Sequence, residues 1–238
     1  MDRSSNNTAR PYRHELKYVI SEGEHEILAR RLKSALTQDK YAKKNGGEYL
    51  IRSLYYDDPF DSAVEEKTSG IQVRDKFRIR IYNYSDASIK LERKHKDGQF
   101  ISKSSLLLTR NECEALLHDE YGFLLRRPEP FAQQMYGIIR TRHLEPKVLV
   151  DYTREAYVYP VEDVRITFDK NIRTAMRCTD IFNPDVPTYP ATDLMNSMIL
   201  EIKFNRYLPT YVHTLVQLGA SQHVAASKYI AARRYEFC

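Results

Sequence analysis

The sequence predicts an α+β fold in which helices pack on the outside of a closed antiparallel β-barrel. Two features lead to this prediction. Several predicted strands alternate charged with aliphatic side chains, and because successive side chains of a strand point to opposite faces, each strand has one charged and one apolar face. Segments with helical spacing of apolar residues separate these strands and can cover the apolar face. The charged faces are then free to line an enclosed, basic lumen.

The most strongly charged strand is predicted at Val73–Tyr82. Its cationic face carries Arg74, Lys76, Arg78 and Arg80. For one isolated strand, charged alternation is more typical of a solvated sheet face. A run of a single sign is unusual on such a face because like charges repel one another. This strand therefore favours a face that holds a polyanion.

Three other predicted strands carry a glutamate two residues before a lysine. They are Tyr12–Ile20 with Glu15 and Lys17, Ile89–Lys94 with Glu92 and Lys94, and Met198–Phe204 with Glu201 and Lys203. Carboxylates that can hold a metal, set beside cations that can hold phosphate, are the composition of a metal-assisted phosphate site. The repetition of this pattern on separate strands strengthens the prediction of a shared lumen.

The other elements follow from capping, periodicity and turn signals. Capping boxes at Ser21 and Glu24 and at Thr109 and Glu112 open two covering helices. Further helices are predicted at Phe60–Thr68, Phe131–Arg142, Tyr211–Leu218 and Ala225–Tyr235. Further strands are predicted at Tyr49–Tyr56, Phe100–Leu108, Pro146–Tyr152 and Val164–Asp169. Residues 39–47 are predicted to form a loop, residues 96–99 a hairpin connection, and the proline-containing residues 179–196 a loop or an edge excursion.

Length and composition indicate one basic, soluble domain. The chain of 238 residues is long enough for a single large domain with a core, expected over residues 11–238, and the polar residues 1–10 are expected to be a disordered tail. The net charge of +5 makes a polyanionic partner plausible without distinguishing nucleic acid, polyphosphate, nucleotide or an anionic membrane.

The cysteines and the absence of long apolar segments indicate a cytoplasmic protein. Cys113, Cys178 and Cys238 are odd in number and lack the short spacing of metal ligands, which is typical of reduced thiols. The chain has no stretch with the apolar character of a signal peptide or a membrane span.

With these residues placed, the chain resembles the VTC domain family, which includes the catalytic domain of the vacuolar transporter chaperone complex and bacterial polyphosphate polymerases. This family lies within the triphosphate tunnel metalloenzyme (CYTH-like) superfamily. The matching segments are Arg13–Tyr18, Ile51–Asp57, Phe77–Tyr82, Leu91–Lys94, Leu200–Phe204 and Ser227–Tyr229, in the family's order. Each segment is a weak signal alone, but together they are specific.

The resemblance implies an eight-stranded tunnel that transfers the γ-phosphate of ATP to a growing polyphosphate chain. It implies phosphate binding by Lys17, Arg52, Lys67, Arg78, Arg80, Lys94, Lys103, Lys203, Ser227 and Lys228. Among the site residues, Arg78, Arg80, Lys94 and Glu201 would be catalytic. The cofactor would be Mn²⁺ or Mg²⁺, bound chiefly by Glu201 together with Glu15 and Glu92. ATP and polyphosphate are the expected partners, a membrane-protein partner is compatible with the family, and no oligomeric state is predicted.

One departure from the superfamily pattern leaves other functions open. The triphosphatase branch opens with Glu-x-Glu-x-Lys, whereas Arg13 stands here in place of the first glutamate. Losing a carboxylate and gaining a cation favours holding polyanions over activating water. The alternatives are an inorganic triphosphatase of the same superfamily and a non-catalytic polyphosphate or nucleotide sensor. Nucleic acid is not an expected partner, because no clustered aromatic platform accompanies the basic strand.

Overall fold

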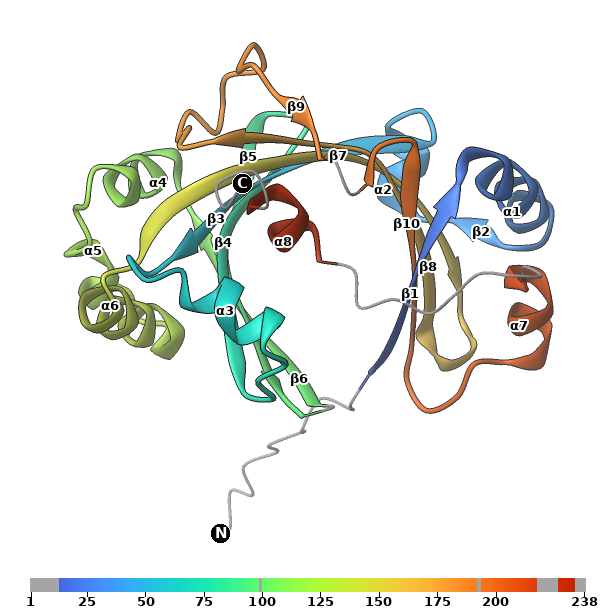
Figure 1. The fold of residues 1–238 in the computed structure, drawn as a ribbon, viewed down its shortest axis with the longest axis horizontal. Helices are drawn as coiled ribbons and strands as arrows, with labels where there is room; N and C mark the ends of the chain where they lie inside the picture. The colour runs from blue at the N-terminus through green and yellow to red at the C-terminus, as the bar shows by residue number, and fades with distance from the viewer. Residues whose placement is uncertain (1–12, 99, 192–193, 218–226, 234–238) are drawn as a thin grey trace, which may run out of the picture.

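A computed structural model describes residues 13–98, 100–191, 194–217 and 227–233. The expected disordered tail at residues 1–10 lies outside this part of the chain. The described residues form one large curved sheet with helices around it (Figure 1).

Eight antiparallel strands form the main path of the sheet, in the order β1-β10-β8-β7-β3-β4-β5-β6. Their bounds are β1 His14–Ser21, β10 Ser197–Phe204, β8 Val164–Met176, β7 Glu145–Tyr159, β3 Glu48–Asp57, β4 Arg74–Tyr82, β5 Ser85–Asp97 and β6 Phe100–Leu108. Two short strands lie off this path, β2 (Thr37–Gln38) on β7 and β9 (Tyr189–Pro190) on β8. The predicted class, an antiparallel sheet of eight principal strands with helices, is confirmed.

The sheet is curved but not closed. Within the described residues, β1 pairs only with β10 and β6 only with β5, so these two strands are the edges of the sheet. Side chains bridge the gap instead, since Lys94 Nζ of β5 lies 2.9 Å from Glu15 Oε2 of β1. The predicted closure by backbone pairing is therefore wrong.

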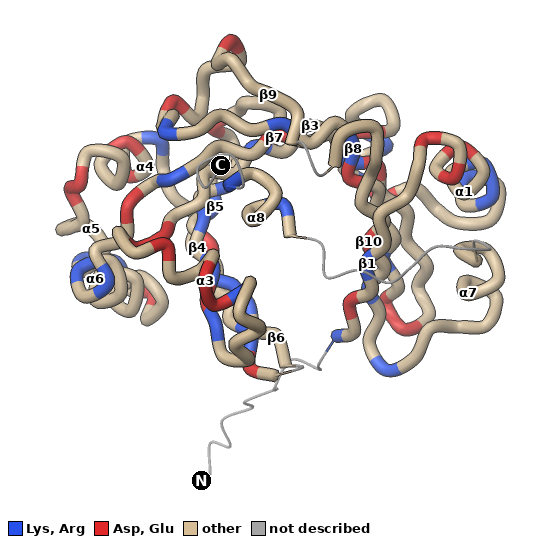
Figure 2. Tube along the Cα trace, viewed as in Figure 1, with Lys and Arg blue, Asp and Glu red and all other residues tan. Residues whose placement is uncertain are grey.

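Alternation along the strands separates the two faces of the sheet. In β4, Phe77, Ile79 and Ile81 are buried against the helices, whereas Arg78 and Arg80 lie on the concave face. The register between β4 and β5 sets Arg78 opposite Glu92. The concave face is thus the charged one, as the sequence predicts, and Figure 2 shows lysine and arginine positions along β4 and β5.

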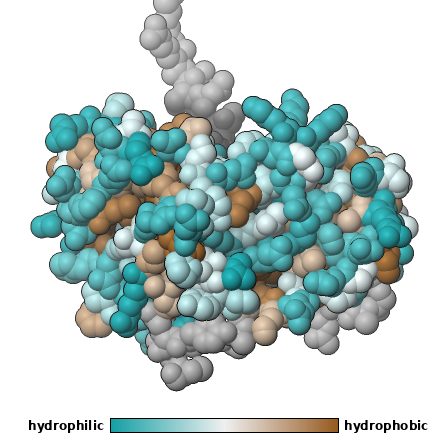
Figure 3. Space-filling view, turned by 90° about the horizontal axis from the view of Figure 1, so that it is seen from above, coloured by the Kyte–Doolittle hydropathy of each residue, from teal (hydrophilic) through white to brown (hydrophobic). Residues whose placement is uncertain are grey.

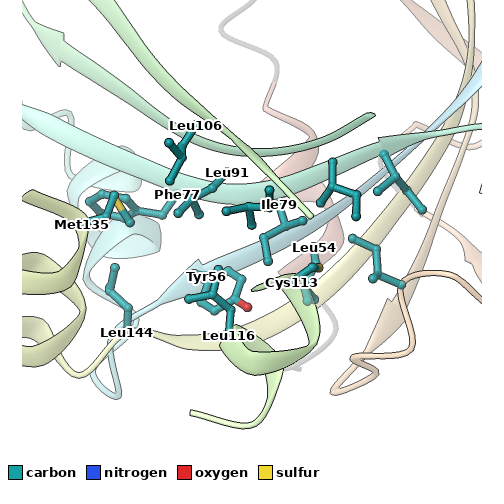
Figure 4. Packing of buried hydrophobic residues seen from close by; sticks show 14 of the residues in the cluster. Leu54, Tyr56, Phe77, Ile79, Leu91, Leu106, Cys113, Leu116, Met135 and Leu144 are labelled. Carbon is teal, nitrogen blue, oxygen red and sulfur yellow. The ribbon is translucent and has the colours of Figure 1, made fainter. Parts of the chain in front are cut away.

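Helices cover the convex face in two groups. The first is α1 (Glu22–Ala35) with α7 (Thr210–Val216), and the second is α4 (Arg110–Leu117), α5 (Phe123–Arg126) and α6 (Pro130–Arg142). Both predicted capping boxes are present, at the starts of α1 and α4. In the second group, Cys113, Leu116 and Met135 belong to one buried cluster with Phe77 and Ile79 of the sheet (Figure 4). These contacts fix the convex face of β4 and thereby the positions of the cations on its other face.

The remaining helices are short, and the face of the molecule in Figure 3 is mainly polar. Residues 39–47, predicted as a loop, contain helix α2 (Lys40–Lys44), and α3 is Ser62–Thr68. No helix among the described residues combines the length and the apolar character needed to cross a bilayer. The face in Figure 3 is largely hydrophilic, with hydrophobic residues scattered among polar ones.

One helix, α8 (Lys228–Arg233), lies on the concave side of the sheet and not with the covering helices (Figure 1). Tyr229 stacks on Tyr55 of β3 with ring centroids 5.1 Å apart, and its hydroxyl donates to Asp57 Oδ2 at 2.6 Å. Arg233 pairs with Asp61 at 2.8 Å. Helix α8 thus packs Tyr229, Ala231 and Ala232 into a buried cluster with Tyr55 and brings Lys228 to the inner face of the sheet.

The contact between Tyr229 and Asp57 is expected to anchor α8. Tyr229→Phe keeps the ring stacking but leaves the buried Asp57 carboxylate without this hydrogen bond. The free energy of unfolding in urea should fall by about 1–3 kcal/mol. Tyr189→Phe, at a hydroxyl on an exposed ring, is the matched control and should change little. Equal stability of Tyr229→Phe and the unmodified protein would contradict this anchoring role.

Candidate functional site

A cavity of about 320 Å³ lies on the concave side of the sheet. Among the residues that the structure describes, twelve cationic side chains line it: Lys17, Lys67, Arg74, Lys76, Arg78, Arg80, Lys94, Lys96, Lys103, Arg154, Lys203 and Lys228. Three carboxylates line it as well: Glu15, Glu92 and Glu201. Tyr55, Ile101, Tyr152, Ser227 and Tyr229 complete the lining. Every predicted site residue except Arg52 is therefore brought to one cavity.

Arg52 points away from the cavity, so its predicted phosphate-binding position is wrong. Its guanidinium is fully buried, and donates to both carboxylate oxygens of Asp151 at 2.8 and 2.7 Å and to the carbonyl oxygen of Asn183. The Tyr84 ring lies 4.4 Å from its carbon Cζ. Since Tyr55 of β3 faces the cavity, strand alternation places Arg52 on the opposite face. Arg52 stabilises the convex side.

Glu92 holds three cations at one side of the cavity. Its Oε2 accepts from Arg78 Nε at 2.7 Å and lies 3.8 Å from Arg80 NH1, and Lys103 pairs with its other oxygen. Burial alone would raise the pKa of Glu92, but the charges of these three cations lower it well below the usual range. Glu92 therefore stays ionised and fixes the two arginines.

Tyrosine hydroxyls complete the orientation of these arginines. Arg78 NH1 donates to the Tyr55 hydroxyl at 3.2 Å, and Arg80 NH2 donates to the Tyr152 hydroxyl at 3.0 Å. Burial raises the pKa of Tyr55, yet the charges of Arg78, Arg80 and Lys228 outweigh it and lower that pKa. Each guanidinium is thus held from two sides before any ligand binds.

Glu201 of β10 and Glu15 of β1 form a second anionic centre, on the β1 side of the gap between the sheet edges. Glu201 lies 3.4 Å from Lys17 Nζ and 3.1 Å from Lys203 Nζ, and Lys17 also pairs with Glu15. Burial raises the pKa of Glu201, but the charges of Lys203 and Lys17, among others, lower it well below the usual range. The predicted Glu-x-Lys pairs of β1 and β10 thus come together as neighbours in the sheet.

Asp169 and Arg154 were not among the predicted site residues. Arg154 Nε donates to Asp169 Oδ1 at 2.6 Å, and Lys228 Nζ of α8 lies 2.5 Å from Asp169 Oδ2. Burial raises the pKa of Asp169, but Arg154 and Lys228 lower it to about 2. Strand β7 continues past its predicted end at Tyr152, and alternation from Tyr152 to Arg154 is the signal that could have found Arg154.

Other cavity cations were visible in the sequence but not chosen as site residues. Arg74 and Lys76 continue the alternation of Arg78 and Arg80, and Lys96 continues that of Lys94. Arg13, at the position of the missing carboxylate, pairs with Asp163 at 2.8 Å and does not line the cavity.

Two of the three candidate metal ligands lie together. Glu15 and Glu201 both pair with Lys17, whereas Glu92 is held by Arg78, Arg80 and Lys103. In the described part of the chain, no three His, Cys, Asp or Glu residues form a group able to hold a metal. Mg²⁺ usually binds through one or two carboxylates together with phosphates and water. The Glu15 and Glu201 pair fits an ion of this kind that is shared with a phosphate ligand.

Comparisons with known proteins agree with this geometry. The family model described as "VTC domain" matches residues 12–237. No curated protein matches the chain. Among solved structures, HpAC1 from Hippeastrum, described as having a dominant triphosphatase activity, is similar over 94% of this chain and 95% of its own, with 14% identity and a TM-score of 0.55. The protein bh2851 from Bacillus halodurans, described as a candidate adenylate cyclase, is similar over 86% of each chain, with 13% identity and a TM-score of 0.49.

The two faces of the sheet predict different effects of removing an arginine. Arg52→Met leaves the Asp151 carboxylate buried without its partner, and should lower the free energy of unfolding by about 3–5 kcal/mol. Arg80→Met should cost clearly less, because Arg78 and Lys103 still hold Glu92 and one repelling charge is removed from the cavity. Urea unfolding of both variants measures the difference. A larger loss for Arg80→Met would contradict the assignment of Arg52 to the convex side.

Proposed function

The chain belongs to the VTC domain family, and we propose that it is a polyphosphate polymerase that transfers the γ-phosphate of ATP to a growing polyphosphate chain. The observation that carries the proposal is the charge of the cavity, which twelve cations and three carboxylates line among the described residues. Its volume of about 320 Å³ lies at the lower end of the usual range for small-molecule sites, roughly 300–1,000 Å³. A compact polyanion such as a triphosphate supplies the charge that this cavity lacks.

Catalysis of phosphoryl transfer depends mainly on positioning the reacting groups and on stabilising the charge of the transferred phosphate. Arg78 and Arg80 suit the transferred phosphate, because a guanidinium can bind two phosphate oxygens at once and stays protonated. Glu92 and the tyrosine hydroxyls hold both guanidinium groups in place, so little rearrangement is needed on binding. Lys94 and Lys203 act as point charges along the rest of the chain of phosphates.

The proposed reaction needs no dedicated general base. An oxygen of the terminal phosphate of the acceptor chain attacks the γ-phosphorus of ATP, the new P–O bond forms, and the bond to the β–γ bridging oxygen breaks. ADP leaves with that oxygen, and the polyphosphate is one phosphate longer. The attacking oxygen is already anionic, so no proton has to be removed from it.

Glu201 and Glu15 are the proposed ligands of Mn²⁺ or Mg²⁺. When bound, the ion would offset negative charge on the phosphates. Both glutamates now pair with lysines, chiefly Lys17, Lys94 and Lys203. With an ion bound to the carboxylates, these lysines would be available to bind phosphate oxygens.

An inorganic triphosphatase is the second candidate function, and the position of Glu15 and Glu201 on either side of Lys17, with which both pair, favours it. A metal ion on two neighbouring carboxylates can also activate water, which would then attack the terminal phosphate in place of an acceptor chain. Triphosphatase activity is the property described for HpAC1, which shares the fold. This function would release orthophosphate from tripolyphosphate without chain growth.

Incubation of the purified protein with ATP and Mn²⁺, followed by gel electrophoresis, distinguishes the two functions. We expect polyphosphate to accumulate, and its rate of formation to fall by on the order of 10²–10³ in Arg78→Ala and at least as far in Glu201→Ala, because each removes charge stabilisation at the reacting phosphate. Arg206→Ala is the matched control, since this exposed arginine pairs with Glu162 away from the cavity.

The products decide between the candidates. Orthophosphate without polymer would support the triphosphatase and contradict the polymerase. Tight binding of ATP with no turnover of ATP or tripolyphosphate would contradict both enzymes and leave a polyphosphate or nucleotide sensor.

A further inference from the structure

Among the described residues Lys76 has no acidic partner, unlike most of the lysines that line the cavity. In the described part of the chain, its Nζ forms no ion pair and donates to the Ser227 hydroxyl oxygen at 2.8 Å. By contrast, five other cavity lysines each pair with a carboxylate: Lys17, Lys94, Lys103, Lys203 and Lys228. The charge of Lys76 is therefore one that the described protein does not balance.

The largest charge effects on Lys76 come from cations. They come from three other elements and from its own strand: Lys94 of β5, Lys67 of α3, Lys17 of β1 and Arg74 of β4. Helix α8 and the residue before it contribute the Ser227 hydroxyl and the ring of Tyr229, whose centroid is 5.8 Å from Nζ. Glu15 lies on β1, the edge strand on the other side of the gap, and already pairs with both Lys17 and Lys94.

This environment disfavours the ammonium form of Lys76. Burial, followed by the charges of Lys94, Lys67, Lys17 and Arg74, lowers its pKa to about 7. At neutral pH, a substantial share of the molecules therefore carries a neutral amine at this position.

Ser227 has a proton to offer a ligand at the same place. Its hydroxyl oxygen accepts from Lys76 Nζ and, at 3.5 Å, from the backbone N–H of Ile230. A serine hydroxyl has one proton and two acceptor positions. Both described bonds use it as an acceptor, so its proton can point to a phosphate oxygen beside Nζ.

We propose that Lys76, beside the expected phosphate-binding residue Ser227, completes a phosphate subsite with its ligand, and that the Lys76 amine takes up a proton from solvent when polyphosphate binds. This inference rests on the proposed function, because it assigns a role within the same cavity. A phosphate anion beside Nζ favours the ammonium form, as any nearby opposite charge does. Binding of polyphosphate is then coupled to pH through one named side chain.

The sign of the pH effect follows from this coupling. Below a pH of about 7 the free protein already carries the ammonium form, and above it a proton must be acquired on binding. The affinity for tripolyphosphate should fall roughly tenfold between about pH 6 and about pH 8 from this residue alone. In Lys76→Arg this contribution should disappear, because arginine keeps its charge over this range.

Calorimetric titration with tripolyphosphate tests the subsite. It is carried out at about pH 8, without divalent ions, in two buffers with different ionisation enthalpies, so that the proton uptake can be counted. The unmodified protein should take up close to one proton more than Lys76→Arg, and protonation of the ligand itself cancels in this difference. Lys43→Arg, at an exposed lysine of α2, is the control and should match the unmodified protein.

A second variant tests whether the loss of proton uptake comes from removing the lysine amine or from a structural effect of the introduced arginine. Lys76→Met, which cannot titrate, should also lose the extra proton uptake and should bind tripolyphosphate more weakly than Lys76→Arg. Tight binding with equal proton uptake in the unmodified protein and both variants would overturn the subsite and leave the proposed function intact. Failure of the unmodified protein to bind tripolyphosphate at any pH would instead contradict the proposed function.

Discussion

The structure depends on holding many cations around one small cavity against their mutual repulsion. Twelve lysines and arginines line this space together with three glutamates. Glu92 pairs with one group of cations, and Glu15 and Glu201 pair with another. The buried Asp169 pairs with Arg154 and Lys228. The apolar convex face, packed under the helices, keeps the strands in place while their other face carries this excess charge. A polyanion bound in the cavity would offset this excess charge.

The same constraint accounts for the pattern of pKa shifts. Carboxylates such as Glu92 and Glu201 have lowered pKa values because cations surround them, and several lysines have lowered pKa values because burial and other cations oppose their charge. Arg78 and Arg80 are fixed by a carboxylate and by tyrosine hydroxyls, which suits groups that must meet a phosphate in a set orientation. In the described part of the chain Lys76 contacts the Ser227 hydroxyl but no carboxylate, and the proposed ligand supplies the negative charge.

Strand alternation explains what could be predicted from the sequence. It correctly separated Arg78 and Arg80 from Phe77 and Ile79, because the faces of a strand follow from spacing alone. Arg52 was misplaced because it was selected by resemblance and not by alternation within its strand. Whether the two edge strands meet, and whether the last helix lies inside or outside the sheet, depend on long-range packing of segments that are distant in the sequence, and neither leaves a local pattern.

The central claim is that the cavity requires a polyanion to balance its charge, and the most direct test is the unfolding free energy measured in urea as tripolyphosphate is added at constant ionic strength. A ligand that binds only the folded protein should raise this free energy by about 2.7 kcal/mol at 100 times its dissociation constant. Orthophosphate or chloride at the same ionic strength should give a much smaller gain, because neither spans cations of separate strands. Equal stabilisation by tripolyphosphate and chloride, or none by either, would contradict the account.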